Sequence, residues 1–261
     1  MQYAFIIGIA RSGTSILGEL LCAHPQVTYL YEAYKLWEFG GAGPNGSHRL
    51  TAEHATPKVT ATIRGEIQEW FRLNGTPGNV LVEKCPRNVL RVPYLHAIFP
   101  EGGIIHIVRD GRDVACSMVP GCGGDSWNHL KPPSWTKLYS KYSGAVRCAL
   151  AWDESIRIAW QDLATIPHLQ IRYEDLLSTP EEVVETLFAY LELDVDPAVT
   201  GFLNKIQDTT RGSYHAQHQG VWFRDNHRVR VGRYQENLTP DELHTINQLI
   251  GPTLTQLGYQ V

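Results

Sequence analysis

The stretch GIARSGTS, near the N-terminus, has nearly the pattern of a nucleotide phosphate-binding loop, G-x-x-x-x-G-K-[ST]. Gly8, Gly13 and Ser15 occupy the expected positions, but Thr14 stands where that pattern has lysine. The cation of the stretch lies inside the loop instead, at Arg11. Two glycines before a helix would gather backbone N–H groups and a helix N-terminus around one anion. The missing lysine favours a ligand with a single 5′-phosphate bearing one further group, which needs no magnesium bridge.

A second stretch, RDGRDVACS, supplies groups for another phosphate. Arg109 is expected at the end of a strand, where a nucleotide triphosphatase would place a magnesium-binding aspartate, and Ser117 follows in the next helix. An arginine fork and a hydroxyl form a suitable clamp for a second, separate phosphate. The ordinary alternative for Arg109 is a salt bridge to Asp110 or Asp113.

Strand and helix patterns alternate around these two stretches. Short continuous apolar runs predict strands buried on both faces at residues 3–9, 79–84 and 103–109, and LQIRY predicts a fourth strand at 169–173. Helical spacing predicts helices at about 14–24, 87–98, 110–119, 135–164, 179–191 and from 239 onward. This alternation predicts an α/β fold with a P-loop-like central parallel sheet flanked by helices. We expect a single domain over residues 1–261, with three irregular segments as candidate walls of a site: 38–57, 119–134 and 208–234.

Composition narrows the classes of function. The net charge of −4 and the pI near 6.3 argue against a general binder of nucleic acid or anionic membranes. No apolar run approaches the ~20 residues of a membrane span, and the first run lacks the basic front of a signal sequence. The five cysteines form no CxxC pair, so we expect reduced thiols, with Cys122 in a loop. No two histidines have metal-ligand spacing, which assigns His24, His106 and His129 to structure.

Taken together, the motifs resemble those of the sulfotransferases that use 3′-phosphoadenosine 5′-phosphosulfate (PAPS). ARSGTS is similar to that family's 5′-phosphosulfate loop, PRSGTT or PKSGTT, and RDGRDVACS is similar to its 3′-phosphate motif, RDxRDxxxS. EKCPRN…LHAIFP, IRYEDLLSTP and VGRYQENLTPDEL resemble further family segments, in the same order along nearly the whole chain. RSGTSILGELLCAHPQVTYLYEAY is most similar to the tyrosylprotein sulfotransferases and their bacterial relatives. The resemblance implies a bacterial, cytoplasmic enzyme that moves a sulfuryl group from PAPS to a hydroxyl acceptor.

The resemblance also implies a role for each site residue. Glu32 falls at the family's catalytic glutamate and would be the general base, while Arg11 and Lys84 would stabilise charge on the transferring group. Direct in-line transfer needs no protein nucleophile, so positioning and electrostatics would supply most of the catalysis. No metal is expected. The donor would be bound through its 5′-phosphosulfate, adenine and 3′-phosphate by Arg11, Ser12, Gly13, Thr14, Ser15, Tyr173, Arg109, Ser117 and Arg233.

Several of these residues have ordinary structural alternatives. Thr14 and Ser15 could cap the helix that follows the loop. Tyr173 could be a core tyrosine, since tyrosines often lie between core and surface. Lys84 could be a solvated lysine at the end of its strand.

The acceptor is less defined than the donor. The tyrosylprotein enzymes hold acidic peptides partly through an arginine two residues past the catalytic glutamate, and here that position is Tyr34. Tyr31, Tyr34, Trp37 and Phe39 suggest an aromatic wall instead. Such a wall suits a sugar, a phenol or a lipid-like alcohol, with a peptide tyrosine as the remaining option.

Two other functions stay open at this point. The first is a P-loop kinase using ATP and Mg²⁺, in which Glu83 or Asp110 would hold the metal. The second is a catalytically inactive nucleotide-binding module. If Glu32 were not the base of a sulfotransferase, the base would have to be sought among His24, His129 and Asp125.

Overall fold

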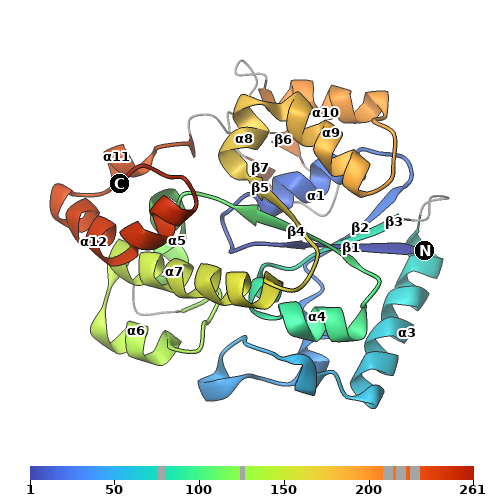
Figure 1. The fold of residues 1–261 in the computed structure, drawn as a ribbon, viewed down its shortest axis with the longest axis horizontal. Coiled ribbons are helices and arrows are strands. Elements are labelled where there is room, and N and C mark those ends of the chain that lie inside the picture. The colour runs from blue at the N-terminus through green and yellow to red at the C-terminus, as the bar shows by residue number, and fades with distance from the viewer. Residues whose placement is uncertain (76–79, 124–126, 208–213, 216–221, 224–229) are drawn as a thin grey trace.

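The centre of the molecule is a parallel sheet of five strands (Figure 1). The computed structural model describes residues 1–75, 80–123, 127–207, 214–215, 222–223 and 230–261. The strands lie in the order β2-β3-β1-β4-β5, and every neighbouring pair is parallel. This confirms the predicted α/β fold. The strand bounds are β1 (Gln2–Ile7), β2 (Val27–Tyr31), β3 (Val80–Lys84), β4 (Gly103–Val108) and β5 (Leu169–Arg172).

Helices cover both faces of this sheet (Figure 1). One face carries α3, α4, α5, α7 and α12, and the other carries α1, α8, α9 and α10. A separate antiparallel pair is formed by β6 (Tyr214–His215) and β7 (Trp222–Phe223). The helix bounds are α1 (Thr14–Cys22), α2 (Tyr34–Trp37), α3 (Pro57–Asn74), α4 (Val92–Ile98), α5 (Gly111–Cys122), α6 (Trp135–Lys141), α7 (Gly144–Leu163), α8 (Tyr173–Ser178), α9 (Pro180–Tyr190), α10 (Pro197–Gln207), α11 (Tyr234–Asn237) and α12 (Pro240–Gln256).

Alternating side chains of each strand build two separate apolar cores. On β1, Phe5 and Ile7 pack with the α3, α4 and α7 face, whereas Ala4 and Ile6 pack with the α1 and α9 face. Because successive residues of a strand point to opposite faces, a strand buried on both sides must be apolar throughout. The continuous apolar run that predicted this strand therefore has its physical cause in the two helical layers.

Strand β2 was not predicted, and it matters for the site. Its sequence VTYLY mixes hydroxyl-bearing and apolar residues and lies at the edge of the sheet. Pairing with β3 sets Tyr31 opposite Lys84 and allows the Glu32 N–H to donate to the Lys84 carbonyl at 2.8 Å. This pairing brings Glu32, which lies far from Lys84 in sequence, to the carboxyl end of β3.

The predicted helix over 135–164 is divided into α6 and α7. Ser143 is extended, and Gly144 has a φ of 53°, a left-handed conformation that favours glycine. The Gly144 N–H donates to the Gly123 carbonyl at 2.8 Å, so this break ties α7 to the end of α5. Helix α5 itself continues to Cys122, which is 1% exposed, so the predicted loop thiol is wrong.

The three predicted irregular segments have different outcomes. Residues 38–57 contain three short 3₁₀ turns, as expected for an irregular segment. The segment 119–134 begins inside α5, and most of the segment 208–234 lies outside the described residues. Tyr173 begins α8 rather than ending a strand.

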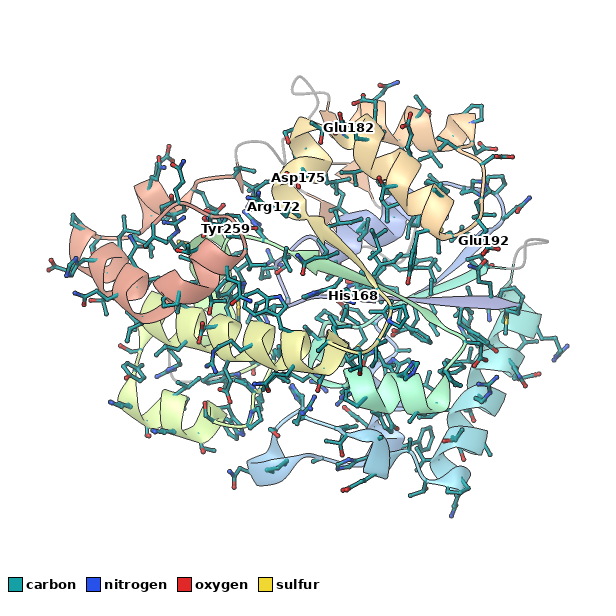
Figure 2. All side chains as sticks on the ribbon, viewed as in Figure 1. His168, Arg172, Asp175, Glu182, Glu192 and Tyr259 are labelled. Carbon is teal, nitrogen blue, oxygen red and sulfur yellow. The ribbon has the colours of Figure 1, made fainter. Side chains whose placement is uncertain are left out.

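The C-terminal end of the chain packs beside the outer strand β5. The Arg172 guanidinium carbon lies 4.5 Å from the centroid of the Tyr259 ring (Figure 2). The Tyr259 hydroxyl donates to Glu174 Oε2 at 2.9 Å. In the part of the chain that the structure describes, no helix has the length and apolar character needed to cross a membrane.

Candidate active site

The glycine loop leads from β1 directly into α1. Gly13 caps α1 with a φ of 95°, and Arg11 also has a positive φ of 77°. A Cβ atom at Gly13 would lie 2.4 Å from the Tyr173 ring, so a side chain has no space there. No side chain caps α1, so the alternative in which Thr14 or Ser15 caps this helix is wrong. The orphan N–H groups of a first helical turn are a suitable site for an anion.

Three predicted residues, Glu32, Lys84 and Ser15, form one cluster, which we call the base cluster. Lys84 Nζ donates to Glu32 Oε1 at 2.6 Å and to Ser15 Oγ at 2.9 Å. The Lys84 side chain is 0% exposed and the Glu32 side chain is 24% exposed. Burial lowers the pKa of Lys84, and the Glu32 carboxylate opposes this effect. Lys84 is therefore a buried and paired cation, not a solvated lysine.

Two tyrosines line the base cluster. Lys84 Nζ lies 4.0 Å from the centroid of the Tyr31 ring, within the range of a cation–π contact. Burial, followed by the charge of Glu32, raises the pKa of Tyr31 to about 12 and also raises that of Tyr34. The Arg87 guanidinium carbon lies 4.6 Å from the centroid of the Tyr34 ring. Both phenols thus keep their protons near neutral pH.

The remaining members of the predicted aromatic wall lie elsewhere. Trp37 is fully buried and donates through Nε1 to Glu83 Oε1 at 2.8 Å, so its place in an acceptor wall is wrong. Phe39 is 51% exposed at the surface. Tyr31 and Tyr34 are thus the wall residues beside Glu32, and the place of Phe39 in the wall stays a prediction.

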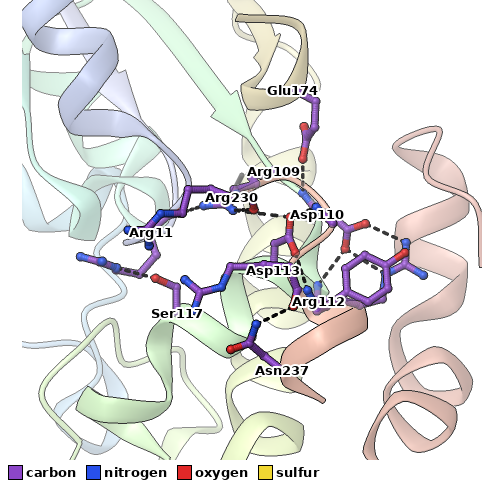
Figure 3. Close-up of polar contacts among 12 residues, drawn as sticks. Arg11, Arg109, Asp110, Arg112, Asp113, Ser117, Glu174, Arg230 and Asn237 are labelled. Atoms are coloured by element: carbon purple, nitrogen blue, oxygen red, sulfur yellow. Dashed lines mark hydrogen bonds and ion pairs between the residues drawn. The ribbon is translucent and has the colours of Figure 1, made fainter. Parts of the chain in front are cut away.

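A second group of predicted residues lies at the end of β4 (Figure 3). Arg109 Nη1 donates to the Arg11 carbonyl at 3.2 Å, and Nη2 donates to the Arg230 carbonyl. Arg109 Nη2 also lies 3.5 Å from Asp113 Oδ2, which is the alternative salt bridge that the sequence left open. Arg109 is 5% exposed, and within the described part of the chain its Nε has no hydrogen-bond partner. We call Arg109, Asp113 and Ser117 the clamp cluster.

Arg11 connects the glycine loop to the clamp cluster. Its Nε donates to Ser117 Oγ at 2.9 Å, while its carbonyl accepts from Arg109 (Figure 3). The two stretches that the sequence singled out, separated by about a hundred residues, thus meet through direct hydrogen bonds. Arg11, the cation inside the glycine loop, therefore joins the predicted 5′-phosphosulfate site to the predicted 3′-phosphate site.

Asp113 fastens the C-terminal part of the chain to the clamp cluster. Its carboxylate accepts from the Gly232 N–H at 2.9 Å and from the Tyr234 N–H at 3.0 Å. Burial raises the pKa of Asp113, and the charge of Arg109 opposes this effect. Arg233, the weakest predicted contact to the 3′-phosphate, therefore lies in a stretch held against α5. The sequence missed this role of Asp113, because Gly232 and Tyr234 lie more than a hundred residues further along the chain.

Tyr173 and Ser12 support the loop from inside. The Tyr173 ring is 1% exposed, contacts Gly13 and lies 4.4 Å from the Arg109 guanidinium carbon. This agrees with the alternative of a core tyrosine, and contact with adenine stays a prediction. Ser12 is 1% exposed, and its N–H donates to the Ile9 carbonyl at 3.0 Å.

The residues proposed for other functions are engaged in structural contacts. Glu83 accepts hydrogen bonds from Trp37 and Asn88, and Asp110 forms an ion pair with Arg112 at 2.7 Å. These contacts leave the kinase hypothesis without an available carboxylate at either predicted position.

The alternative bases differ in their surroundings. His24 Nδ1 accepts from the Gln26 N–H at 3.1 Å, and its Nε2 lies 3.1 Å from the Asp194 carbonyl. Burial, followed by the charge of Arg11, lowers the pKa of His129. Asp125 lies outside the described residues.

The sequence model of the sulfotransferase family matches residues 4–197. The chain belongs to this family. Among curated relatives of this sulfotransferase, the nodulation protein NoeE of Sinorhizobium fredii is 27% identical over 283 residues, covering 98% of this chain and 65% of its own length. Protein-tyrosine sulfotransferase 1 of Danio rerio is 27% identical over 211 residues, covering 76% of this chain and 55% of its own length. The chain therefore spans less than two thirds of these relatives.

Solved structures show that the sulfotransferase also has the fold of its family. The sulfotransferase domain from the curacin biosynthetic pathway matches with a TM-score of 0.62 and 19% identity, covering 100% of this chain and 98% of that domain. Mouse sulfotransferase SULT7A1, complexed with PAP, matches with a TM-score of 0.53 and 16% identity, covering 97% and 84% of the two chains. The family and the fold predicted from the motifs are thus confirmed, whereas the cytoplasmic location stays a prediction.

Proposed function

We propose that this sulfotransferase moves a sulfuryl group from PAPS to a hydroxyl acceptor, with Glu32 as the general base. The observation that carries the proposal is the position of Lys84. Its Nζ donates both to Ser15, which follows the glycine loop, and to Glu32. About a quarter of the Glu32 side chain is exposed to solvent. One buried cation therefore links the group that would hold the donor to the group that would receive the acceptor's proton.

The residues present fit a nucleotide with phosphates at two places. The glycine loop and the first turn of α1 offer backbone N–H groups for the 5′-phosphosulfate. Arg109 and Ser117 offer a guanidinium and a hydroxyl for the 3′-phosphate, and Arg109 Nε is a buried donor that no described residue satisfies. Buried donors without partners are rare in native proteins, so this atom favours a ligand. PAP, the desulfated product of PAPS, is present in the mouse relative of the same fold.

The chemistry assigned to the chain is proton removal and charge stabilisation. Glu32 takes the proton of the acceptor hydroxyl while that oxygen forms its bond to sulfur and the bond from sulfur to the 5′-phosphate breaks. Lys84 and Arg11 stabilise the negative charge on the sulfuryl oxygens and on the departing phosphate. Because Lys84 is buried beside Glu32 before any substrate binds, little rearrangement of charge is required during the transfer.

The acceptor that we propose is a hydroxyl compound with an aromatic or apolar body. Tyr31 and Tyr34 flank Glu32 and offer ring surface beside the base. The similar proteins include a nodulation protein and protein-tyrosine sulfotransferases. Phenols, sugars and tyrosine peptides are therefore the first compounds to test.

The direct test is a transfer assay with PAPS and a library of phenols, sugars, alcohols and tyrosine peptides, read by mass spectrometry for products that gain SO₃. We expect at least one acceptor to be sulfated in the presence of excess EDTA. Failure of every acceptor, together with phosphorylation of one of them from ATP and Mg²⁺, would contradict the proposal.

A further inference from the structure

Glu83 and Lys84 are consecutive residues of β3, and their side chains project to opposite faces of the sheet. Neighbouring Leu81 packs in the core on the α3 and α7 side, whereas Val82 packs in the core on the α1 side. By the alternation of a strand, Glu83 shares the face of Leu81 and Lys84 shares the face of Val82. Both side chains are 0% exposed.

On its own face, Glu83 bonds two buried donors. Trp37 Nε1 donates to Glu83 Oε1 at 2.8 Å, and Asn88 Nδ2 donates to Glu83 Oε2 at 3.1 Å. Trp37 and Asn88 are themselves 0% exposed. A buried carboxyl group is costly unless it is hydrogen-bonded, so this arrangement is specific and not a surface accident.

Trp37 belongs to the short segment that follows Glu32. Glu32 has a φ of 46°, and its carbonyl accepts from the Tyr34 N–H at 2.6 Å, so the chain turns sharply from β2 into α2. Before the turn, the Tyr31 ring contacts Lys84. After the turn, Trp37 bonds Glu83 on the opposite face. Lys84 therefore contacts the residue before the turn at Glu32, and Glu83 bonds a residue after it.

We propose that Glu83 is a positioning residue that fixes Glu32 against Lys84 by holding Trp37, an inference that rests on the proposed function of Glu32. A non-glycine residue with a positive φ costs free energy and persists only when its surroundings fix it. The Trp37–Glu83 hydrogen bond is such a constraint, since Trp37 lies five residues after Glu32 and its bond fixes the segment that follows the turn. Burial raises the pKa of Glu83 to about 8, so the carboxyl is a neutral partner for Trp37 near pH 7.

The experiment compares two buried tryptophans. Trp37→Phe removes the donor to Glu83 with little loss of volume. Trp152→Phe is the matched control, because Trp152 is equally buried and its Nε1 has no hydrogen-bond partner among the described residues. Turnover is measured with PAPS and the best acceptor of the library described above, PAP affinity by calorimetry, and folding by thermal unfolding.

We expect Trp37→Phe to lower kcat about tenfold or more, because small displacements of a catalytic group are costly, and to leave PAP affinity within about twofold. Trp152→Phe is expected to keep kcat within about twofold of wild type. Glu83→Met is expected to lower kcat like Trp37→Phe. Glu83→Gln is expected to restore it, since the amide still accepts from Trp37, and a reoriented Asn88 amide would offer its unpartnered Oδ1 to the new N–H₂.

Two results would overturn the positioning role. The first is full turnover in folded Trp37→Phe and Glu83→Met. The second is an equal loss of kcat and PAP affinity in both, which would indicate general disruption. Glu32→Gln, assayed alongside, separates this inference from the proposed function. Full turnover in Glu32→Gln contradicts the function, whereas full turnover in the Trp37 and Glu83 variants alone contradicts only the positioning.

Discussion

The base cluster and the clamp cluster lie at the carboxyl ends of neighbouring parts of one sheet, but their cations are held differently. Lys84 is already bonded to the two groups with which it is proposed to work, Ser15 and Glu32. Arg109 is bonded mainly to main-chain oxygens, those of Arg11 and Arg230, and to Asp113 at 3.5 Å. A phosphate can bind Arg109 through Nε, which no described residue satisfies, and by sharing or replacing the main-chain contacts of its Nη atoms.

This difference separates the two tasks of the enzyme. A cluster whose charges are already paired stabilises the transition state without reorganisation. Substitutions in the base cluster are therefore expected to lower mainly kcat. A cation that exchanges main-chain oxygens for a phosphate contributes to binding, so its loss is expected mainly in donor affinity. Substitutions in each cluster test this division.

The largest effect is expected for Glu32→Gln. The amide keeps the size of the side chain and can still accept from Lys84, but it cannot take a proton. General-base catalysis is worth about 10²–10⁴-fold, so kcat should fall by that range while PAP affinity hardly changes. Steady-state kinetics and calorimetry provide the measurement. Glu69→Gln is the matched control, since Glu69 is exposed and pairs with Arg72 on the surface of α3.

Arg109→Ala is expected to weaken donor binding. Removing a charged hydrogen-bond donor costs about 1.5–3 kcal/mol, so the KM for PAPS should rise by roughly tenfold to a hundredfold. The kcat at saturating PAPS should change much less. Arg64→Ala, which removes a half-exposed arginine paired with Glu101, is the control. An unchanged KM for PAPS in Arg109→Ala would remove the clamp cluster from the donor site.

A pH dependence of stability is expected from Glu83, behind the base cluster. Its pKa is raised from 4.5 to about 8 by burial, so between these values the unfolded state releases a proton that the folded state keeps. The free energy of unfolding should therefore fall as pH rises from 4.5 towards 8. Relative to Glu83→Gln, wild type should lose about 2 kcal/mol between pH 6 and pH 8. Parallel urea titrations of both proteins at the two pH values would measure this difference, and parallel changes in both would contradict it.

The smallest effect is expected for Ser117→Ala. The substitution removes the hydroxyl that accepts from Arg11 Nε and leaves the helix intact. A single hydrogen bond contributes about 0.5–1.5 kcal/mol, so PAP affinity should fall roughly twofold to tenfold. Ser155→Ala is the control, because that buried hydroxyl donates to the Ala151 carbonyl of its own helix. Calorimetric titration of PAP distinguishes the two variants.

The parts of this molecule that the sequence predicted are those with a local signal. The apolar runs predicted β1, β3 and β4 because both faces of these strands are buried under helices. The outer strand β5 was also predicted, although Ile171 is its one buried residue. The edge strand β2 carries polar residues and gave no such run, so it was missed. The division of α6 from α7 depends on a hydrogen bond between Gly144 and Gly123, which no local pattern reveals.

In the site, too, the sequence predicted the local motifs and missed contacts between segments far apart in the chain. The glycine loop and the RDGRDVACS stretch were recognisable as motifs, and the structure joins them through Arg11, Arg109 and Ser117. Trp37 was assigned to an acceptor wall because its exposure could not be inferred from its neighbours in sequence. Its burial against Glu83 depends on the pairing of β2 with β3, which also brings Glu32 to Lys84.

The central claim, a donor site with separate places for two phosphates, is tested most directly by calorimetric titration of PAP and AMP into the wild-type protein. The two ligands differ only in the 3′-phosphate that the clamp cluster is proposed to bind. One charged hydrogen bond left unmade costs about 1.5–3 kcal/mol, so PAP should bind at least about tenfold more tightly than AMP. The preference should persist in Glu32→Gln and disappear in Arg109→Ala. Equal affinities for PAP and AMP in the wild-type protein would contradict the account.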